Sequence, residues 1–125
     1  MPGRHWILAG AALCGLGVVS GAFGAHALRS SLEAADQLES WRTAVRYQVW
    51  HGLALVALAP SLGARSRGRA VLPLFVVGTL LFSGSIYGLA LGCPGAILGP
   101  VTPLGGLLLI AGWAWVAAAT FRSRS

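Results

Sequence analysis

Four long apolar segments, separated by short polar gaps, most constrain what this chain can fold into. They run over residues 6–25, 43–62, 71–92 and 101–121. Each is close to the roughly 20 residues that cross a hydrocarbon core about 30 Å thick. Because a bilayer has no water to satisfy backbone N–H and C=O groups, segments of this length form helices. We therefore predict an all-α fold, a four-helix transmembrane bundle in which residues 1–125 form a single integral membrane domain.

The composition excludes a water-soluble domain and argues against a nucleic-acid-binding module. Hydrophobic residues make up 56% of the chain and charged residues 10%, whereas soluble domains carry about 25% charged residues. All nine basic residues are arginines, and they give a net charge of +6. They lie in the gaps between apolar segments, and not in a cluster with exposed aromatic residues as in nucleic-acid modules. We expect the lipid bilayer as the surroundings and no nucleic acid as a partner.

The arginines also predict the orientation of the chain in the membrane. If all four segments cross, one side holds six arginines and no acid: Arg4, Arg65, Arg67, Arg69, Arg122 and Arg124. The other side holds three arginines and all three acids: Arg29, Arg42, Arg46, Glu33, Asp36 and Glu39. Because basic loops stay on the cytoplasmic side, we predict a multi-pass protein of the cell membrane with both termini cytoplasmic. Trp113 and Trp115, with Trp6, are assigned to an aromatic belt at that interface.

The two longer connections have different character. Ser30 and Glu33 have the spacing of a capping box, which begins a helix by satisfying free N–H groups. Apolar residues follow every three or four positions, at Leu28, Leu32, Ala35, Leu38 and Trp41. This pattern predicts a short amphipathic helix in the membrane interface, between the first and second spans, that bends into the second span near Trp41. Residues 93–100 are rich in glycine and proline and predict an uncharged turn.

Small residues at helical spacing predict where the helices pack. In lipid, glycine faces let two backbones approach closely. The candidate packing positions are Gly17, Gly21, Gly84, Gly88, Gly92, Gly105 and Gly106. The glycines of the first segment favour an uncleaved helix over a signal peptide, although Ala25-His-Ala27 fits a cleavage pattern. Cys14 and Cys93 fall at different membrane depths, so we expect two free thiols.

The second segment is the most polar, and its polar side chains share one helical face. Their depth, from the 1.5 Å rise per residue, matches that of hydroxyl-bearing side chains in the third segment. The predicted polar pocket consists of His26, Tyr47, Gln48, His51, Ser83, Ser85 and Tyr87. Three interpretations of His51 are open: a hydrogen-bonded core residue, a group that handles protons or a small molecule, and a metal or haem ligand.

Motifs for catalysis or metal binding are missing from the sequence. No carboxylate lies within a span to complete a zinc or iron site, and Ser83 and Ser85 have no carboxylate-oriented histidine beside them. A phosphate-binding glycine loop is also absent. We therefore predict no metal and no cofactor, and we favour a protein that is not an enzyme.

Four ordered motifs carry a resemblance to a known family. They are Gly21-Ala-Phe-Gly-Ala-His-Ala-Leu-Arg29, Tyr47-Gln-Val-Trp-His-Gly-Leu-Ala-Leu55, Phe82-Ser-Gly-Ser-Ile-Tyr87, and Thr102-Pro-Leu-Gly-Gly106 with Gly112-Trp113. Over essentially its whole length the chain resembles the transmembrane-protein-256-like family, small membrane proteins with a domain of unknown function. The resemblance implies four membrane helices and an uncleaved first helix, and it implies no activity or cofactor. The family pattern has alanine where this chain has Gly52.

Two functional hypotheses follow. Size, glycine-rich packing faces and the missing catalytic set favour a non-enzymatic accessory or assembly partner in the membrane. Its partner would be another protein or a second copy of the chain. The alternative is a protein that binds or transports a small lipid-soluble molecule, or protons, through a polar pocket in the outer leaflet around His51 and Tyr87.

Overall fold

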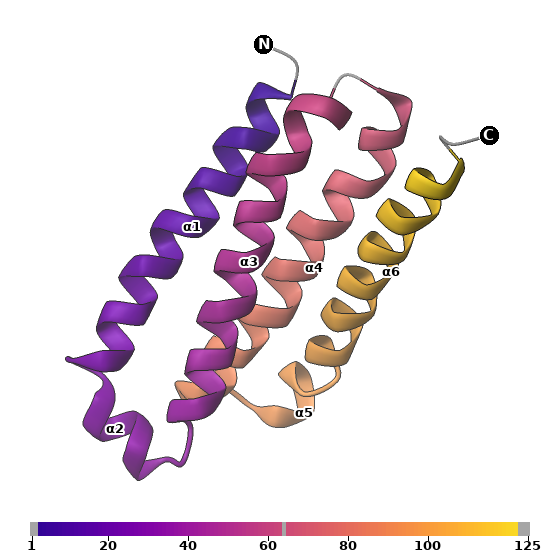
Figure 1. Ribbon diagram of the computed structural model, residues 1–125. Coiled ribbons are helices and arrows are strands. Elements are labelled where there is room, and N and C mark those ends of the chain that lie inside the picture. The colour runs from indigo at the N-terminus through magenta and orange to yellow at the C-terminus, as the bar shows by residue number, and fades with distance from the viewer. Residues whose placement is uncertain (1–2, 64, 123–125) are drawn as a thin grey trace.

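The computed structural model describes residues 3–63 and 65–122, and this part of the chain is helical throughout, with short turns. Four helices are long and two are short (Figure 1). In chain order they are α1 (Arg4–Ala25), α2 (Arg29–Ala34), α3 (Leu38–Leu62), α4 (Ser66–Ala90), α5 (Gly95–Leu98) and α6 (Val101–Arg122). The all-α prediction is confirmed.

The long helices form a row in the order α1, α3, α4, α6 (Figure 1). Helix α3 packs against α1 and α4, and α6 packs against α4. Helices α1 and α6 therefore occupy the two edges of an open row. An open arrangement is stable in lipid because burying apolar side chains against protein gains little over leaving them in hydrocarbon.

Three helical segments are long and apolar enough to cross a membrane: Arg4–Ala25, Ser66–Ala90 and Gly95–Arg122. Helix α3 has the length, at 25 residues, but it is not among the three. Its N-terminal half carries the polar residues Arg42, Arg46, Gln48 and His51. Because α3 lies inside the row, its polar side chains can be buried against α1 and α4, and its outer surface need not be uniformly apolar.

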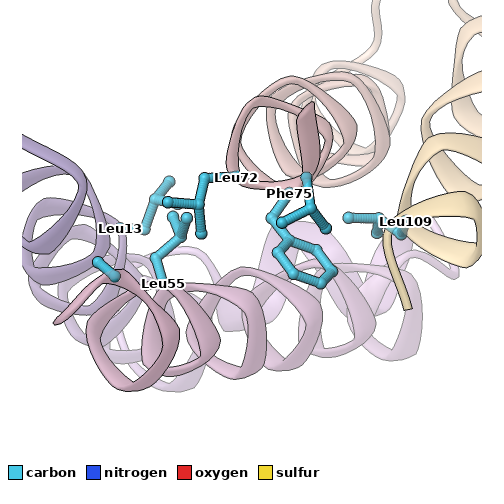
Figure 2. Packing of buried hydrophobic residues seen from close by; sticks show 7 residues of the cluster. Leu13, Leu55, Leu72, Phe75 and Leu109 are labelled. Atoms are coloured by element: carbon cyan, nitrogen blue, oxygen red, sulfur yellow. The ribbon is translucent and has the colours of Figure 1, made fainter. Parts of the chain in front are cut away.

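The apolar core links neighbouring helices along the row. Leu13 of α1, Leu55 of α3 and Leu72 of α4 meet in one part of it, and Phe75 of α4 and Leu109 of α6 meet in the next (Figure 2). Leu55, Leu72 and Phe75 have no exposed surface. The core therefore runs across the row and is not centred on one axis.

Glycine pairs set the two closest helix crossings. Where α1 crosses α3, a Cβ atom on Gly52 would lie 2.8 Å from the Gly10 carbonyl oxygen and 2.7 Å from Cys14 Sγ. Where α4 crosses α6, a Cβ atom on Gly105 would lie 2.9 Å from the Gly78 carbonyl oxygen. Since side-chain carbon atoms do not approach backbone oxygen this closely, glycine is required at both crossings.

The predicted glycine groove of α4 does not pack against another long helix of this chain. A Cβ atom added to Gly84 or Gly92 would meet nothing within 4 Å, and one on Gly88 would meet the Leu98 side chain of the short helix α5. Gly92 lies beyond the end of α4 and has a positive φ of 95°. For Gly84 the physical reason is helical phase. The close contact to α6 comes from Gly78, and Gly84 follows it by six residues, which turns it about 120° away. By contrast, Gly17 lies against Val49, and Gly105 and Gly106 lie against Phe82.

The connections differ from the prediction in detail. Helix α2 begins at Arg29, with Leu28 as its N-cap and no side-chain cap, so the capping box at Ser30 is not formed. Leu32 of α2 is buried against Trp41 and Ala90, which fastens α2 to the ends of α3 and α4. The chain turns between α2 and α3 at Asp36, which has a positive φ of 55°. The connector 93–100 contains the one-turn helix α5, which we did not predict.

The ends of the four long helices lie within five residues of the ends of the four apolar segments. Both cysteines are free, as expected. The beginning of α1, the α3–α4 turn and the end of α6 lie at one end of the row, whereas α2 and α5 lie at the other (Figure 1). We call the latter the α2 end.

Candidate functional site

The candidate site is built on α3, because this helix carries polar side chains between two neighbours. Ala44, Gln48 and His51 are buried, whereas Trp50 and Leu53 on the opposite side are each 55% exposed. This is the division that the helical period predicts. The buried side chains then separate into two groups with different neighbours.

The first group is the Gln48 network, formed by Gln48, Tyr87 and the Leu13 carbonyl group. Gln48 Nε2 donates a hydrogen bond of 2.9 Å to the Leu13 oxygen of α1. The Tyr87 hydroxyl of α4 donates one of 2.7 Å to Gln48 Oε1. One amide thus joins three helices, with its nitrogen donating and its oxygen accepting.

Two further bonds lie around this network. Ser83 Oγ donates to the Ala44 carbonyl oxygen at 2.7 Å, which joins α4 to α3. Trp41 Nε1 donates to the Ser20 carbonyl oxygen at 2.8 Å, which joins α3 to α1. Buried polar groups in contact with one another in this way fix the register of the helices.

The second group contains His51 and its partner on α6. His51 Nδ1 lies 2.7 Å from the Tyr47 carbonyl oxygen, and Trp113 Nε1 donates to His51 Nε2 at 3.0 Å. Because an indole nitrogen can only donate, Nε2 is the acceptor, and the proton of the neutral ring is on Nδ1. Both ring nitrogens are therefore used. The Phe75 and Trp113 rings pack around the imidazole with centroids 5.7 Å and 5.9 Å away.

A groove lies beside His51 between α3 and α6. It measures about 410 Å³ and we call it the α3/α6 groove. It exists because α3 and α6 each pack against α4 and leave a gap between them. Its lining is Tyr47, Trp50, His51, Phe82, Gly106, Leu109, Ile110 and Trp113.

The remaining hydroxyl groups lie between α4 and α6 or within α4. Ser85 Oγ and Thr102 Oγ1 are 2.5 Å apart, and Ser85 also donates to the Phe82 carbonyl oxygen at 3.0 Å. Thr79 Oγ1 is buried and has no hydrogen-bond partner among the described residues. The Ser85–Thr102 pair adds a polar link between the two helices.

The predicted pocket is therefore divided. Gln48, Ser83 and Tyr87 lie between α1, α3 and α4, while Tyr47 and His51 line the α3/α6 groove. Ser85 faces Thr102 of α6. His26 is exposed at the end of α1, beside an apolar hollow formed by that helix and Ala27. Within residues 3–63 and 65–122, no three His, Cys, Asp or Glu side chains lie close enough to hold a metal ion.

Sequence reasoning missed the partners Trp41, Trp113 and Thr102. Trp113 was assigned to an aromatic belt, but its indole N–H binds His51. A usable indication was present, because a tryptophan N–H within an apolar helix needs an acceptor. Neither periodicity nor composition shows which neighbouring helix supplies that acceptor.

Comparison with known proteins places the chain in a family. Residues 20–106 match the family described as "Protein of unknown function (DUF423)". A UPF0382 membrane protein of Schizosaccharomyces pombe is 44% identical over 111 residues, which cover 83% of this chain and 92% of the relative.

Two bacterial relatives carry the same name. The UPF0382 membrane protein of Staphylococcus haemolyticus is 41% identical over 95% of this chain and 97% of its own length. The UPF0382 membrane protein YwdK of Bacillus subtilis is 36% identical over 95% of this chain and 98% of its own. No solved structure matches the chain. This chain therefore belongs to the DUF423 family, and its relatives are UPF0382 membrane proteins.

Proposed function

We propose that this protein is a non-enzymatic, four-span membrane protein that serves as an accessory or assembly partner of a larger membrane complex. The observation that carries the proposal is a contrast between polar side chains that are bonded within the chain and apolar helix faces that are left exposed. Five of the seven side chains of the predicted pocket form hydrogen bonds within the chain, namely Gln48, His51, Ser83, Ser85 and Tyr87. The outward faces of α1 and α6 are apolar and exposed, with Leu16 at 60% and Leu107 at 61%.

The proposal includes α3 as the fourth span. Its 25 residues extend about 37 Å, which is enough for a core about 30 Å thick. Burial of Gln48 and His51 between neighbouring helices supports this placement, since polar groups in a bilayer face protein and not lipid. An uncleaved α1 is supported by its glycine crossing with α3.

We place both termini in the cytoplasm of the cell. Support comes from Arg4, Arg65, Arg67, Arg69 and Arg122, which all belong to the end of the row opposite α2. In a variant without Cys14 and Cys93, an impermeant maleimide added to intact cells should label Glu33→Cys and leave Arg67→Cys unlabelled. The reverse pattern would overturn the orientation.

The family assignment is also part of the proposal. We propose that this chain is related to the transmembrane-protein-256-like family, because four motifs of the sequence resemble that family.

Photo-crosslinking in native membranes tests the accessory role. A photoreactive amino acid at Leu16 of α1 or Leu107 of α6 should capture the same protein partner in repeated preparations. The buried position Leu55, which is 0% exposed, serves as the control and should capture none. If both outward positions yield lipid adducts alone, the accessory role is wrong.

A second candidate function is binding of a small lipid-soluble molecule in the α3/α6 groove. It is favoured by the size of this groove and by the Tyr47 and His51 side chains in its lining. Tyr87 is not part of this lining, because it binds Gln48. Mass spectrometry of the protein purified in mild detergent should detect a copurifying molecule that Ile110→Trp displaces. If no such molecule copurifies with the wild-type protein, the groove is filled by membrane lipid and this second function is wrong.

A further inference from the structure

A second hollow lies between α1 and α3, near the α2 end of the row. It measures about 260 Å³ and we call it the α1/α3 groove. Its lining is Gly21, Gly24, Ala25, Trp41, Arg42, Val45 and Arg46. Two arginines thus stand beside a surface that is otherwise apolar.

Glycine and a fixed tryptophan create this groove. A Cβ atom on Gly24 would lie 2.5 Å from Trp41 Cδ1, so the indole ring occupies the space next to that glycine. The ring is held by its hydrogen bond to the Ser20 carbonyl oxygen. A Cβ atom on Gly21 would meet only Val45 Cγ1, at 3.5 Å, which is ordinary contact. The floor at Gly21 is therefore open.

The two arginines on its rim differ in their partners. Arg42 Nη1 binds Glu39 Oε1 at 2.6 Å. Arg46, four residues further along α3, makes no hydrogen bond or ion pair to the described residues. Its neighbour Val45 contacts Gly21, which is four residues, or about 6 Å, from the end of α1. Arg46 therefore has no direct partner, although its charge interacts at longer range with Glu39, and it stands about one helical turn from the end of α1.

We propose that the α1/α3 groove binds an anionic phospholipid. The lipid phosphate accepts hydrogen bonds from Arg46 and from the free side of Arg42, and the first carbons of one acyl chain lie on Gly21 and Val45. Arginine suits this role because its planar guanidinium group can donate two parallel bonds to a phosphate. The apolar floor favours a lipid over free phosphate, which has nothing to place there. This site goes beyond the accessory role, and it rests on α1 and α3 crossing the membrane.

The test measures lipid binding to the purified full-length chain in dodecyl maltoside. Phosphatidylglycerol and phosphatidylcholine with identical acyl chains are titrated separately, and bound lipid is counted by native mass spectrometry. Wild type should bind phosphatidylglycerol more tightly. Arg46→Gln should weaken that binding roughly fivefold, since one arginine near a lipid phosphate contributes about that factor. Gly21→Leu should weaken it at least as much, because its side chain fills the floor and leaves both arginines in place.

Two control variants match these changes. Arg29→Gln removes one exposed arginine of α2 that pairs with Glu33 outside the groove. Gly15→Leu adds the same side chain to α1 at a position where a Cβ atom meets nothing within 4 Å. Both should bind phosphatidylglycerol within twofold of wild type. If Gly21→Leu does not fold, Gly21→Ala replaces it, because its added methyl group makes ordinary contact and should weaken binding about twofold.

Three results would overturn the proposal. Equal binding of the two lipids by wild type removes the role of charge. If Arg29→Gln and Arg46→Gln weaken phosphatidylglycerol binding equally, the lipid is attracted by the net charge of the protein and not by a site in the groove. If soluble glycerol phosphate at the same concentration prevents the binding of phosphatidylglycerol, the groove binds a phosphate group and not a lipid. None of these results depends on a protein partner. The cysteine labelling of α2 and of the first turn of α4 separately tests whether the helices cross the membrane.

Discussion

The two sides of α3 hold polar side chains in different ways. Toward α1 and α4, Gln48 is 6% exposed and binds a carbonyl group on one side and a phenol on the other. Toward α6, His51 is equally buried, at 5% exposed, but its partner Trp113 is 45% exposed and lines the α3/α6 groove. We call the side of α3 toward α1 and α4 the closed side, because its polar groups bind one another. We call the side toward α6 the open side, because it borders the groove.

This difference follows from the order of the helices. Helices α1 and α4 both contact α3 along its length, so they enclose the side chains between them. Helix α6 packs mainly against α4. It touches α3 through the Trp113–His51 hydrogen bond and otherwise leaves the groove between the two helices. Buried polar groups that satisfy one another hold the helices in place. By contrast, the Tyr47 hydroxyl group lines the groove without a hydrogen-bond partner among the described residues, so it is available to another molecule. We therefore expect mutations on the closed side to affect stability and those on the open side to affect binding.

The largest expected effect is at the α1–α3 crossing on the closed side. Gly52→Val should lower the free energy of unfolding by about 3 kcal/mol, because a branched side chain would force the two backbones apart. Gly15→Val, at an open position on α1, is the control and should change little. Unfolding by sodium dodecyl sulfate, followed by circular dichroism, measures both. A Gly52→Val protein as stable as the control would mean that α1 and α3 do not cross closely.

The next effect is loss of the amide that joins three helices. Gln48→Leu should cost about 1–2 kcal/mol, because the Leu13 carbonyl group loses its side-chain donor and the Tyr87 hydroxyl group loses its acceptor. Leucine has a similar volume, so packing is nearly kept. The same unfolding assay measures the change. A neutral or stabilising substitution would show that the network contributes little to stability.

Two further variants compare the sides directly. Tyr87→Phe removes the hydrogen-bond donor to Gln48, and Trp113→Phe removes the donor to His51 together with part of the ring that packs on Phe75. We therefore compare coupling energies, and we expect about 0.6 kcal/mol between Tyr87 and Gln48, the average for a polar contact between membrane helices, and less between Trp113 and His51, which borders a groove. Double-mutant cycles with Gln48→Leu and His51→Leu isolate the two coupling energies. A larger coupling for His51–Trp113 would reverse the assignment of closed and open sides.

The sequence was sufficient for the elements that depend on one helix at a time. Apolar length located the four long helices, and the 3.6-residue period separated Gln48 and His51 from Trp50 and Leu53. It also brought Gln48 and Tyr87 to a common depth, and the two are hydrogen-bonded. These properties depend on rise and rotation, which every α-helix shares.

Contacts between two helices could not be predicted from the periodicity of either helix alone. The period places His51 on a face but does not say that α6 supplies its partner, so Trp113 was interpreted as an interfacial residue. The spacing of Gly84, Gly88 and Gly92 was indistinguishable from that of a packing face. Gly78, the residue that does contact α6, was overlooked because it lies outside that repeat. Open and closed rows of helices have the same single-helix patterns.

The smallest expected effect concerns the glycine face that α6 does not cover. Gly84 is exposed and has no neighbour within 4 Å of an added Cβ atom, so Gly84→Leu should change the free energy of unfolding by less than about 0.5 kcal/mol. The control is Gly78→Leu, whose Cβ atom would lie 2.8 Å from Leu109 Cδ2 and which should be clearly destabilised. The mass of each protein in detergent, from light scattering, adds a second measurement. If Gly84→Leu remains as stable as wild type but converts a dimer to a monomer, this face packs against a second copy of the chain, and the glycine repeat has a role between molecules that it lacks within one.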